Sequence, residues 1–126
     1  MANRARAKGT AWESAIRDFL NRALGLVHAD GRFLDPTDPD NVRRQPQEGV
    51  RDVGDLWARP FVLEAKAEKS YDLASYVRQA EREAEAAGLP FGVAVVKRPR
   101  ARVEDGYVVL SLRTFARVLQ YLRDRS

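Results

Sequence analysis

Two carboxylates and a lysine stand close together near the middle of the chain. Asp55 follows Gly54, and an apolar run further on leads into Glu64-Ala65-Lys66. Carboxylate oxygens suit Mg²⁺, which usually keeps several waters and also binds substrate phosphate oxygens. A lysine beside such a pair can position an attacking water, help to deprotonate it, or stabilise developing negative charge. These residue types can therefore bind a divalent metal and attack a phosphodiester.

A β-hairpin would bring these side chains together. We expect strands at residues 53–57 and 61–66, joined by a tight turn at Arg59-Pro60. A turn with this centre places Asp55 opposite Glu64 on one face, with Cβ atoms about 5 Å apart. Lys66 projects from the same face because side chains alternate along a strand. Opposed carboxylates repel, which favours a cation or proton between them. The alternative is an ordinary surface Glu–Lys pair, since such short motifs also arise by chance.

A helix is expected before the hairpin, at residues 11–24. Its buried stripe would be Trp12, Ile16, Phe19 and Ala23. Thr10 and Glu13 have the spacing of a capping box, in which the glutamate reaches back to the Thr10 amide. Arg17, four residues further on, can pair with Glu13.

A second helix is expected at residues 72–87, ending at Gly88. Its buried stripe would be Leu73, Tyr76, Ala80, Ala84 and Ala87. Gln79 borders that stripe, so it is either an exposed glutamine or a residue that reaches Lys66 and the motif strands.

Other strands are expected at residues 42–45, 91–96 and 107–110, the last two as buried runs. Ser111 would cap a final helix with the stripe Leu112, Phe115, Val118 or Leu119, and Leu122. His28 is the only histidine, which argues against a histidine zinc site or a Ser-His-Asp triad, and we expect it to be partly buried and structural.

Composition fits a basic, single-domain protein spanning residues 1–126, with residues 1–9 as a basic arm. The chain lacks cysteine, and no apolar stretch reads as a secretory signal or a membrane span, so we expect a cytoplasmic protein without a membrane partner. The net charge is +4, and the basic residues are arginines apart from Lys8, Lys66, Lys69 and Lys97. Arginine matches phosphate oxygens bidentately.

Two basic clusters are candidates for DNA phosphate contacts, although charged loops also serve solubility alone. Arg4, Arg6 and Lys8 form the arm, and Lys97, Arg98, Arg100 and Arg102 crowd a loop between two strands. Arg43, Arg44 and Arg51 flank a segment expected to lie beside the active site.

Gly-Asp, a strand and Glu-x-Lys together resemble the PD-(D/E)-x-K nuclease superfamily. The resemblance implies an α/β fold: a restriction-endonuclease-like αβββαβ core with a mixed central sheet flanked by helices, here followed by a strand and a helix. It also implies Mg²⁺, replaceable by Mn²⁺, held by Asp55, Glu64, the Ala65 carbonyl and Glu13, with Lys66 and Gln79 as further catalytic residues. Gly54 stands where the superfamily name has proline.

The order of these residues is similar to that in archaeal-type and phage-encoded Holliday junction resolvases. That similarity implies a homodimer that cuts branched DNA in recombination or repair. The alternatives are a nuclease of the same fold that cuts flaps, single strands or linear duplex, and a DNA-binding module without cleavage. A toxin-like or partner-binding module is a further class, for which the Asp55 carboxylate would matter little.

Overall fold

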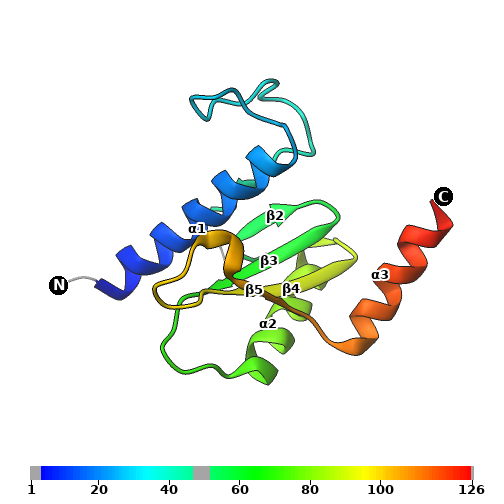
Figure 1. Ribbon diagram of the computed structural model, residues 1–126. Coiled ribbons are helices and arrows are strands. Elements are labelled where there is room, and N and C mark those ends of the chain that lie inside the picture. Colours follow the sequence, from blue (N-terminus) through cyan, green and yellow to red (C-terminus); the bar gives the residue numbers. More distant parts are fainter. Residues whose placement is uncertain (1–3, 47–51, 126) are drawn as a thin grey trace.

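The computed structural model describes residues 4–46 and 52–125, with side chains from Gly9 onward (Figure 1). The elements are α1 (Arg4–Ala23), β1 (Arg43–Arg44), β2 (Leu56–Ala58), β3 (Phe61–Lys66), α2 (Leu73–Ala87), β4 (Phe91–Val96), the 3₁₀ turn η1 (Val103–Asp105), β5 (Tyr107–Val109) and α3 (Leu112–Asp124). The strands form a mixed five-stranded sheet in the order β1-β2-β3-β4-β5. Only the β3–β4 pair is parallel. The class of fold is therefore α/β, with helices and strands in the expected order.

The hairpin has the expected register but a shorter first strand. Ala58 pairs with Phe61 and Leu56 with Leu63, across a turn whose Arg59-Pro60 peptide bond is cis. β2 begins at Leu56 and not at residue 53, because Gly54 adopts a φ of +95° and interrupts the extended backbone.

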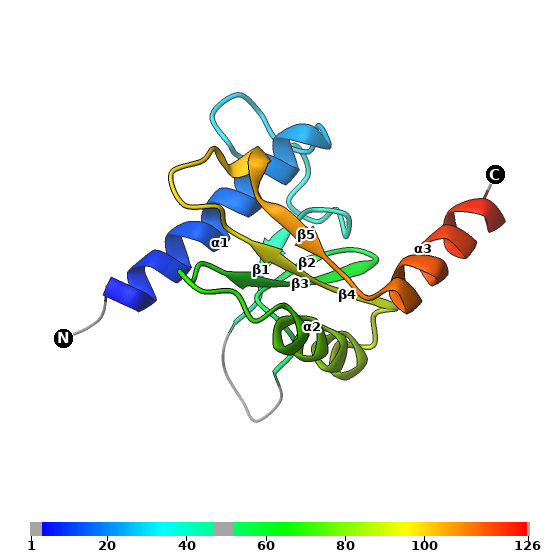
Figure 2. The same ribbon diagram turned by 60° about the horizontal axis from the view of Figure 1, so that its bottom comes forward.

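The two long helices cover opposite faces of the sheet (Figure 2). On one face, Trp12 and Ile16 of α1 pack with Leu63, Val93 and Val95. Trp12 also donates its Nε1 hydrogen to the Val95 carbonyl, at 3.0 Å. On the other face, Tyr76 of α2 packs against Ala94 and Val96. β4 is buried along its whole length, as expected for a strand covered on both sides.

Several expectations about the helices are wrong. α1 begins at Arg4 and not at residue 11, so Thr10 lies inside the helix and the capping box does not form. Phe19 and Ala23 are exposed, because only the stripe that contains Trp12 and Ile16 faces the sheet. In α2, Leu73 is exposed and Ala87 only half-buried, whereas Glu83 is buried within the packing face.

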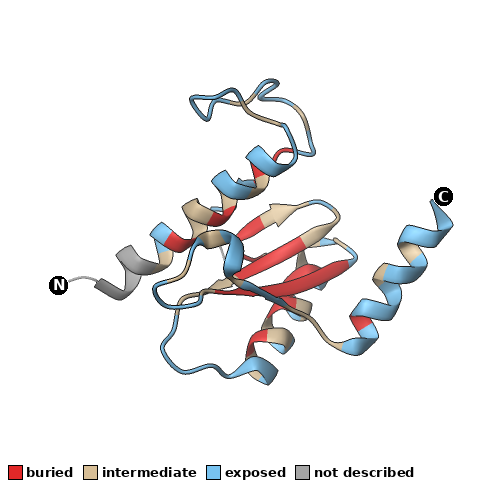
Figure 3. Cartoon of the chain, viewed as in Figure 1, coloured by how far each residue is buried: buried red, intermediate tan, exposed pale blue. Residues whose placement is uncertain are grey.

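The carboxyl-terminal part also departs from expectation. β5 is an edge strand with Tyr107 and Val108 exposed, so it is not a buried run. Ser111 caps α3 as expected, by accepting the Thr114 amide hydrogen at 3.1 Å. The apolar stripe of α3 is nevertheless exposed, because the helix projects from the edge of the body (Figure 3). His28 is exposed too, in a surface loop.

No helix within the described residues is long and apolar enough to cross a membrane.

Gly92 and Gly9 offer a matched test of the packing between α2 and β4. A Cβ at Gly92 would lie 2.1 Å from the Ala80 carbonyl oxygen, which is helix backbone and moves only with the helix, whereas a Cβ at Gly9 meets nothing within 4 Å. We expect Gly92→Ala to destabilise the fold by more than about 2 kcal/mol. Gly9→Ala should stabilise it by roughly 0.5–1 kcal/mol, because alanine is the better helix former. Urea unfolding measures both, and equal effects would contradict the close helix–strand approach.

Candidate active site

The candidate site lies where β3 runs beyond its pairing with β2. Ala65 donates its amide hydrogen to Asp55 Oδ2 at 2.9 Å, so the aspartate side chain takes the position of the missing strand. The Asp55 amide in turn donates to the Leu63 carbonyl at 3.1 Å. In a strand the N–H and C=O of one residue point to the same side, so the Ala65 carbonyl also faces the Asp55 side.

Gly54 makes this turn of the chain possible. Its φ of +95° is a conformation that residues with a Cβ rarely adopt, and a Cβ there would lie 2.2 Å from Val62 Cγ1. The glycine before Asp55 is therefore required by both the backbone and the packing.

Glu64, Lys66 and Gln79 form one hydrogen-bonded network. Lys66 Nζ lies 3.1 Å from Glu64 Oε2 and donates to Gln79 Oε1 at 2.9 Å. Gln79 Nε2 donates to Glu64 Oε2 at 3.1 Å. The glutamine thus reaches the motif strand from α2 and is not an exposed surface residue.

The Asp55 carboxyl is in an environment that resists ionisation. Burial raises its pKa to about 7, and repulsion from Glu64 and Glu13 adds to the rise, although the Ala65 amide opposes it. The group therefore binds a proton readily at neutral pH, and a cation placed beside it would relieve the same repulsion.

Lys66 experiences opposing effects. Burial by itself would lower the pKa of its ammonium group, but the carboxylates of Glu64, Glu68 and Asp55 outweigh burial and raise the pKa. The ammonium also lies 5.3 Å from the centre of the Tyr76 ring. Lys66 is therefore held as a cation and not as a free amine base.

Glu83 is a site residue that the sequence reasoning missed. It is 2% exposed, and its Oε2 accepts a hydrogen bond from Gln79 Nε2 at 3.0 Å. Its Oε1 has no hydrogen-bond partner among the described residues. Burial raises the Glu83 pKa to about 10, helped by the neighbouring Glu64 and Asp52 carboxyls, so the side chain is a neutral acid at pH 7. Its position one helical turn after Gln79, inside an alanine-rich stripe, was the available signal.

Glu13 lies near the site, but its carboxylate forms an ion pair with Arg44. Its Oε1 pairs with Arg44 Nε at 3.1 Å, and its charge still contributes to the raised Asp55 pKa. Arg17 pairs with Asp18 at 3.0 Å and not with Glu13. The structure therefore places Glu13 at the edge of the carboxylate group.

The donor set can be compared with what Mg²⁺ needs. Asp55 and Glu64 offer carboxylate oxygens, and the Ala65 carbonyl faces the same side, which suits an ion that completes its shell with water and phosphate. Within the described parts of the chain, no three acidic, histidine or cysteine side chains gather as a metal-binding group. An ion bound by Asp55, Glu64 and the Ala65 carbonyl would therefore leave most of its coordination shell to water and phosphate, as Mg²⁺ usually does.

One basic cluster lies beside this site. The Lys97 amide donates to the Lys66 carbonyl at 2.9 Å, so the loop with Arg98, Arg100 and Arg102 leaves the sheet next to the motif lysine. Its three arginines are exposed; the Arg98 guanidinium lies over the Tyr107 ring, and Arg102 lies 3.9 Å from Glu104.

The other basic residues expected to contact phosphates either interact within the protein or have side chains outside the described residues. Arg43 stacks over the Phe33 ring at 4.4 Å and donates to the Pro36 carbonyl, and Arg44 holds Glu13. The side chains of Arg4, Arg6 and Lys8, and all of Arg51, lie outside the described residues.

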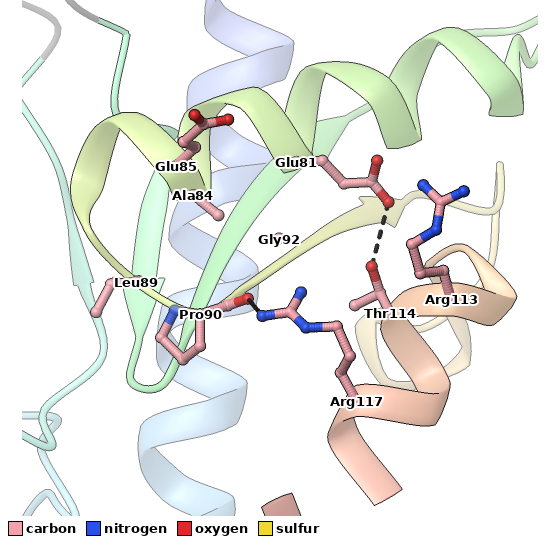
Figure 4. Close-up of a pocket in the computed structure, with 9 residues that line it drawn as sticks. All are labelled: Glu81, Ala84, Glu85, Leu89, Pro90, Gly92, Arg113, Thr114 and Arg117. Atoms are coloured by element: carbon pink, nitrogen blue, oxygen red, sulfur yellow. Dashed lines mark hydrogen bonds between the residues drawn. The ribbon is translucent and has the colours of Figure 1, made fainter. Parts of the chain in front are cut away.

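A hollow of about 350 Å³ lies between α2 and the start of α3 (Figure 4). Its carboxylate Glu81 accepts hydrogen bonds from Ser111 at 2.8 Å and Thr114 at 3.2 Å, and Arg117 donates to the Pro90 carbonyl at 2.9 Å. These contacts anchor the first turns of α3 to the body, and the hollow contains no residue of the motif.

The protonated state of Glu83 gives a pH-dependent stability prediction. Its pKa in the fold lies above the ordinary value of 4.5, so the folded state keeps a proton that the unfolded chain releases as the pH rises. Stability is therefore lost between about pH 4.5 and 10. We expect Glu83→Gln to be more stable than wild type by roughly 2 kcal/mol at pH 8. This difference should shrink toward pH 4.5, as measured by urea unfolding.

Glu85→Gln, an exposed change on the same helix, is the matched control and should show no such pH-dependent gain. A Glu83→Gln protein that is less stable than wild type at pH 8 would contradict a neutral Glu83.

No family model, curated protein or solved structure matches this chain. The arrangement joins two carboxylates, a cationic lysine and an orienting glutamine at one end of a sheet, beside an exposed basic loop.

Proposed function

We propose that this chain is a metal-dependent endodeoxyribonuclease of the PD-(D/E)-x-K superfamily, acting on four-way DNA junctions during recombination or repair. The observation that carries the proposal is the site at the end of β3, where Asp55 and Glu64 share a strained electrostatic environment beside Lys66. The element order and the link from Gln79 to Lys66 give further support.

The metal that this proposal implies is Mg²⁺, with Mn²⁺ as a substitute. Asp55, Glu64 and the Ala65 carbonyl would hold it, and Glu13 would join them directly or through water. Such an ion lowers the pKa of bound water and offsets negative charge at a reacting phosphate.

The side chains of the protein have separable tasks. Lys66, held cationic, places positive charge where the phosphate gains negative charge, or orients the attacking water. Gln79 fixes Lys66 and Glu64 together through its two amide atoms. Glu83, as a neutral acid, stabilises the Gln79 amide without adding a further charge to the site.

The basic loop suggests how DNA would be held. Arg98, Arg100 and Lys97 would contact phosphates close to the scissile bond, since this loop follows the strand that pairs with β3. Contacts of this kind position DNA but do not read its sequence. Symmetric cleavage of a junction needs two such sites, and thus a homodimer. We place this activity in the cytoplasm, in a bacterial host if the protein is phage-encoded.

A DNA-binding module without cleavage is the second candidate. It is favoured by one contact, the Glu13–Arg44 ion pair, which engages one of the expected metal ligands. A binding module would grip DNA equally well with and without Mg²⁺, and it would tolerate loss of the Glu64 carboxylate.

Cleavage of defined DNA substrates separates these functions. An end-labelled four-way junction, a flap, a linear duplex and a single strand are incubated with Mg²⁺, Mn²⁺ or EDTA. We expect paired symmetric nicks in the junction alone, with none in EDTA. Glu64→Gln should lower the rate at least about a hundredfold, because it removes a charged group from the reacting centre, while Glu85→Gln on the exposed face of α2 should cut like wild type.

Cutting of flaps, single strands or duplex would keep the nuclease and replace the junction as its substrate. Junction binding without any metal-dependent cleavage would favour the binding module. Cleavage that survives both EDTA and Glu64→Gln would contradict the proposed site.

The raised Asp55 pKa predicts pH-dependent metal binding. A carboxyl with a pKa of about 7 is mostly protonated at pH 6, and it must lose that proton to bind a cation. We expect Mg²⁺ affinity to rise about fivefold between pH 6 and 7, to reach about ten times its pH 6 value by pH 8, and to level off above that. Calorimetric titration at each pH measures this, and Asp55→Asn should remove the dependence. An affinity that is independent of pH would contradict the role of Asp55.

A further inference from the structure

Helix α3 has two apolar seams, and the body of the protein covers only one of them. Thr114 is buried against α2, and the Tyr121 ring meets the Phe91 ring edge-on with centroids 5.5 Å apart. The second seam consists of Leu112, Phe115, Leu119 and Leu122, all exposed, with Leu112 82% and Leu122 58% exposed. Its spacing of three, four and three residues is the spacing with which helices pack along a common line.

An apolar groove of about 410 Å³ lies next to this seam. It crosses the α1 face of the sheet, from Phe19 on α1 over Val93 to Val108 on β5, and Phe115 of α3 forms part of its wall. Five strands span about 20 Å, while one helix covers about 10 Å. One helix, α1, packs on this face, and α3 leans away at its edge (Figures 1 and 2). The groove is therefore wide enough to lodge the apolar side of another helix.

We infer that this surface is a homodimer interface, in which α3 of a second copy lies in the groove beside α3 of the first. The groove and the exposed seam belong to the same chain and adjoin each other, so a two-fold axis buries both in each copy at once. A ridge and a groove on one molecule, contiguous and both apolar, are self-complementary.

The chemistry and extent of the surface favour a second copy as the occupant. Ala116 and Val118 flank the seam, whereas Arg113 and Arg117 lie on another side of the helix, and Arg123 borders the seam only at its carboxyl-terminal end. Exposed Phe19 and Val108, which both line the groove, extend the patch on the body. With the seam, they expose several hundred Å², which approaches the roughly 800 Å² per partner of a stable interface and is large for a monomer. The groove and the exposed seam would pair two copies whether or not the site cleaves DNA.

Self-association in solution tests the inference without DNA or metal. Sedimentation velocity of the full chain between 1 and 100 µM gives the dimer dissociation constant. Leu119→Asp and Leu122→Asp each place a charge in the seam of both copies. We expect each variant to raise the dimer dissociation constant at least tenfold. Gln120→Asp adds the same charge at an exposed position outside the seam and should leave the constant unchanged. Circular dichroism of each variant reports whether the monomer stays folded.

A wild-type dimer that both seam variants dissociate into folded monomers, and that Gln120→Asp does not, would support the interface. A wild-type monomer at 100 µM would overturn it. A dimer that survives both seam variants would place the interface elsewhere. Seam variants that unfold a monomeric wild type would show instead that α3 occupies the groove of its own chain.

Discussion

The structure depends on holding two carboxyl groups, Asp55 and Glu64, near each other in a partly buried place. Burial and mutual repulsion together raise the Asp55 pKa to about 7, which is the cost of this arrangement. A fold that served only stability would avoid it, since replacing either carboxyl by a neutral group would remove the repulsion. The lysine and glutamine that bind Glu64 offset part of this cost, and a divalent cation would offset the remainder.

The rest of the fold can be understood as support for that pair. The hairpin register sets Asp55 beside Ala65, and Gly54 lets the chain turn into this position. Gly92 lets α2 approach the sheet closely enough for Gln79 to reach Lys66. Glu83 accepts a hydrogen bond from Gln79 Nε2, and because Glu83 is protonated it adds no negative charge to the site. Each of these contacts is local, but together they fix the orientation of the groups that would bind metal and phosphate.

Much of this could be predicted from the sequence because the signals were local. The turn chemistry at Arg59-Pro60 predicted the register that pairs Leu56 with Leu63 and so brings Asp55 alongside Ala65, and Gly88 ends α2 as expected. Predictions failed where a long-range partner decides the outcome. Glu83 is such a case, because the contact of α2 with the sheet buries a glutamate that the apolar periodicity of the helix does not mark as buried. The Thr10 cap failed for a local reason, since the helix begins earlier, at Arg4. The stripe of α3 was read correctly as apolar, but periodicity shows only that a face is apolar and not which molecule covers it.

We propose that Asp55 and Glu64 together form a site for a divalent cation. The most direct measurement is anomalous scattering from crystals grown at pH 8 with Mn²⁺, which locates the ion without reference to any activity. We expect a strong peak in contact with both carboxylates, on the side that the Ala65 carbonyl faces. A peak elsewhere, or no peak while Lys66 and Gln79 still hold Glu64, would contradict it.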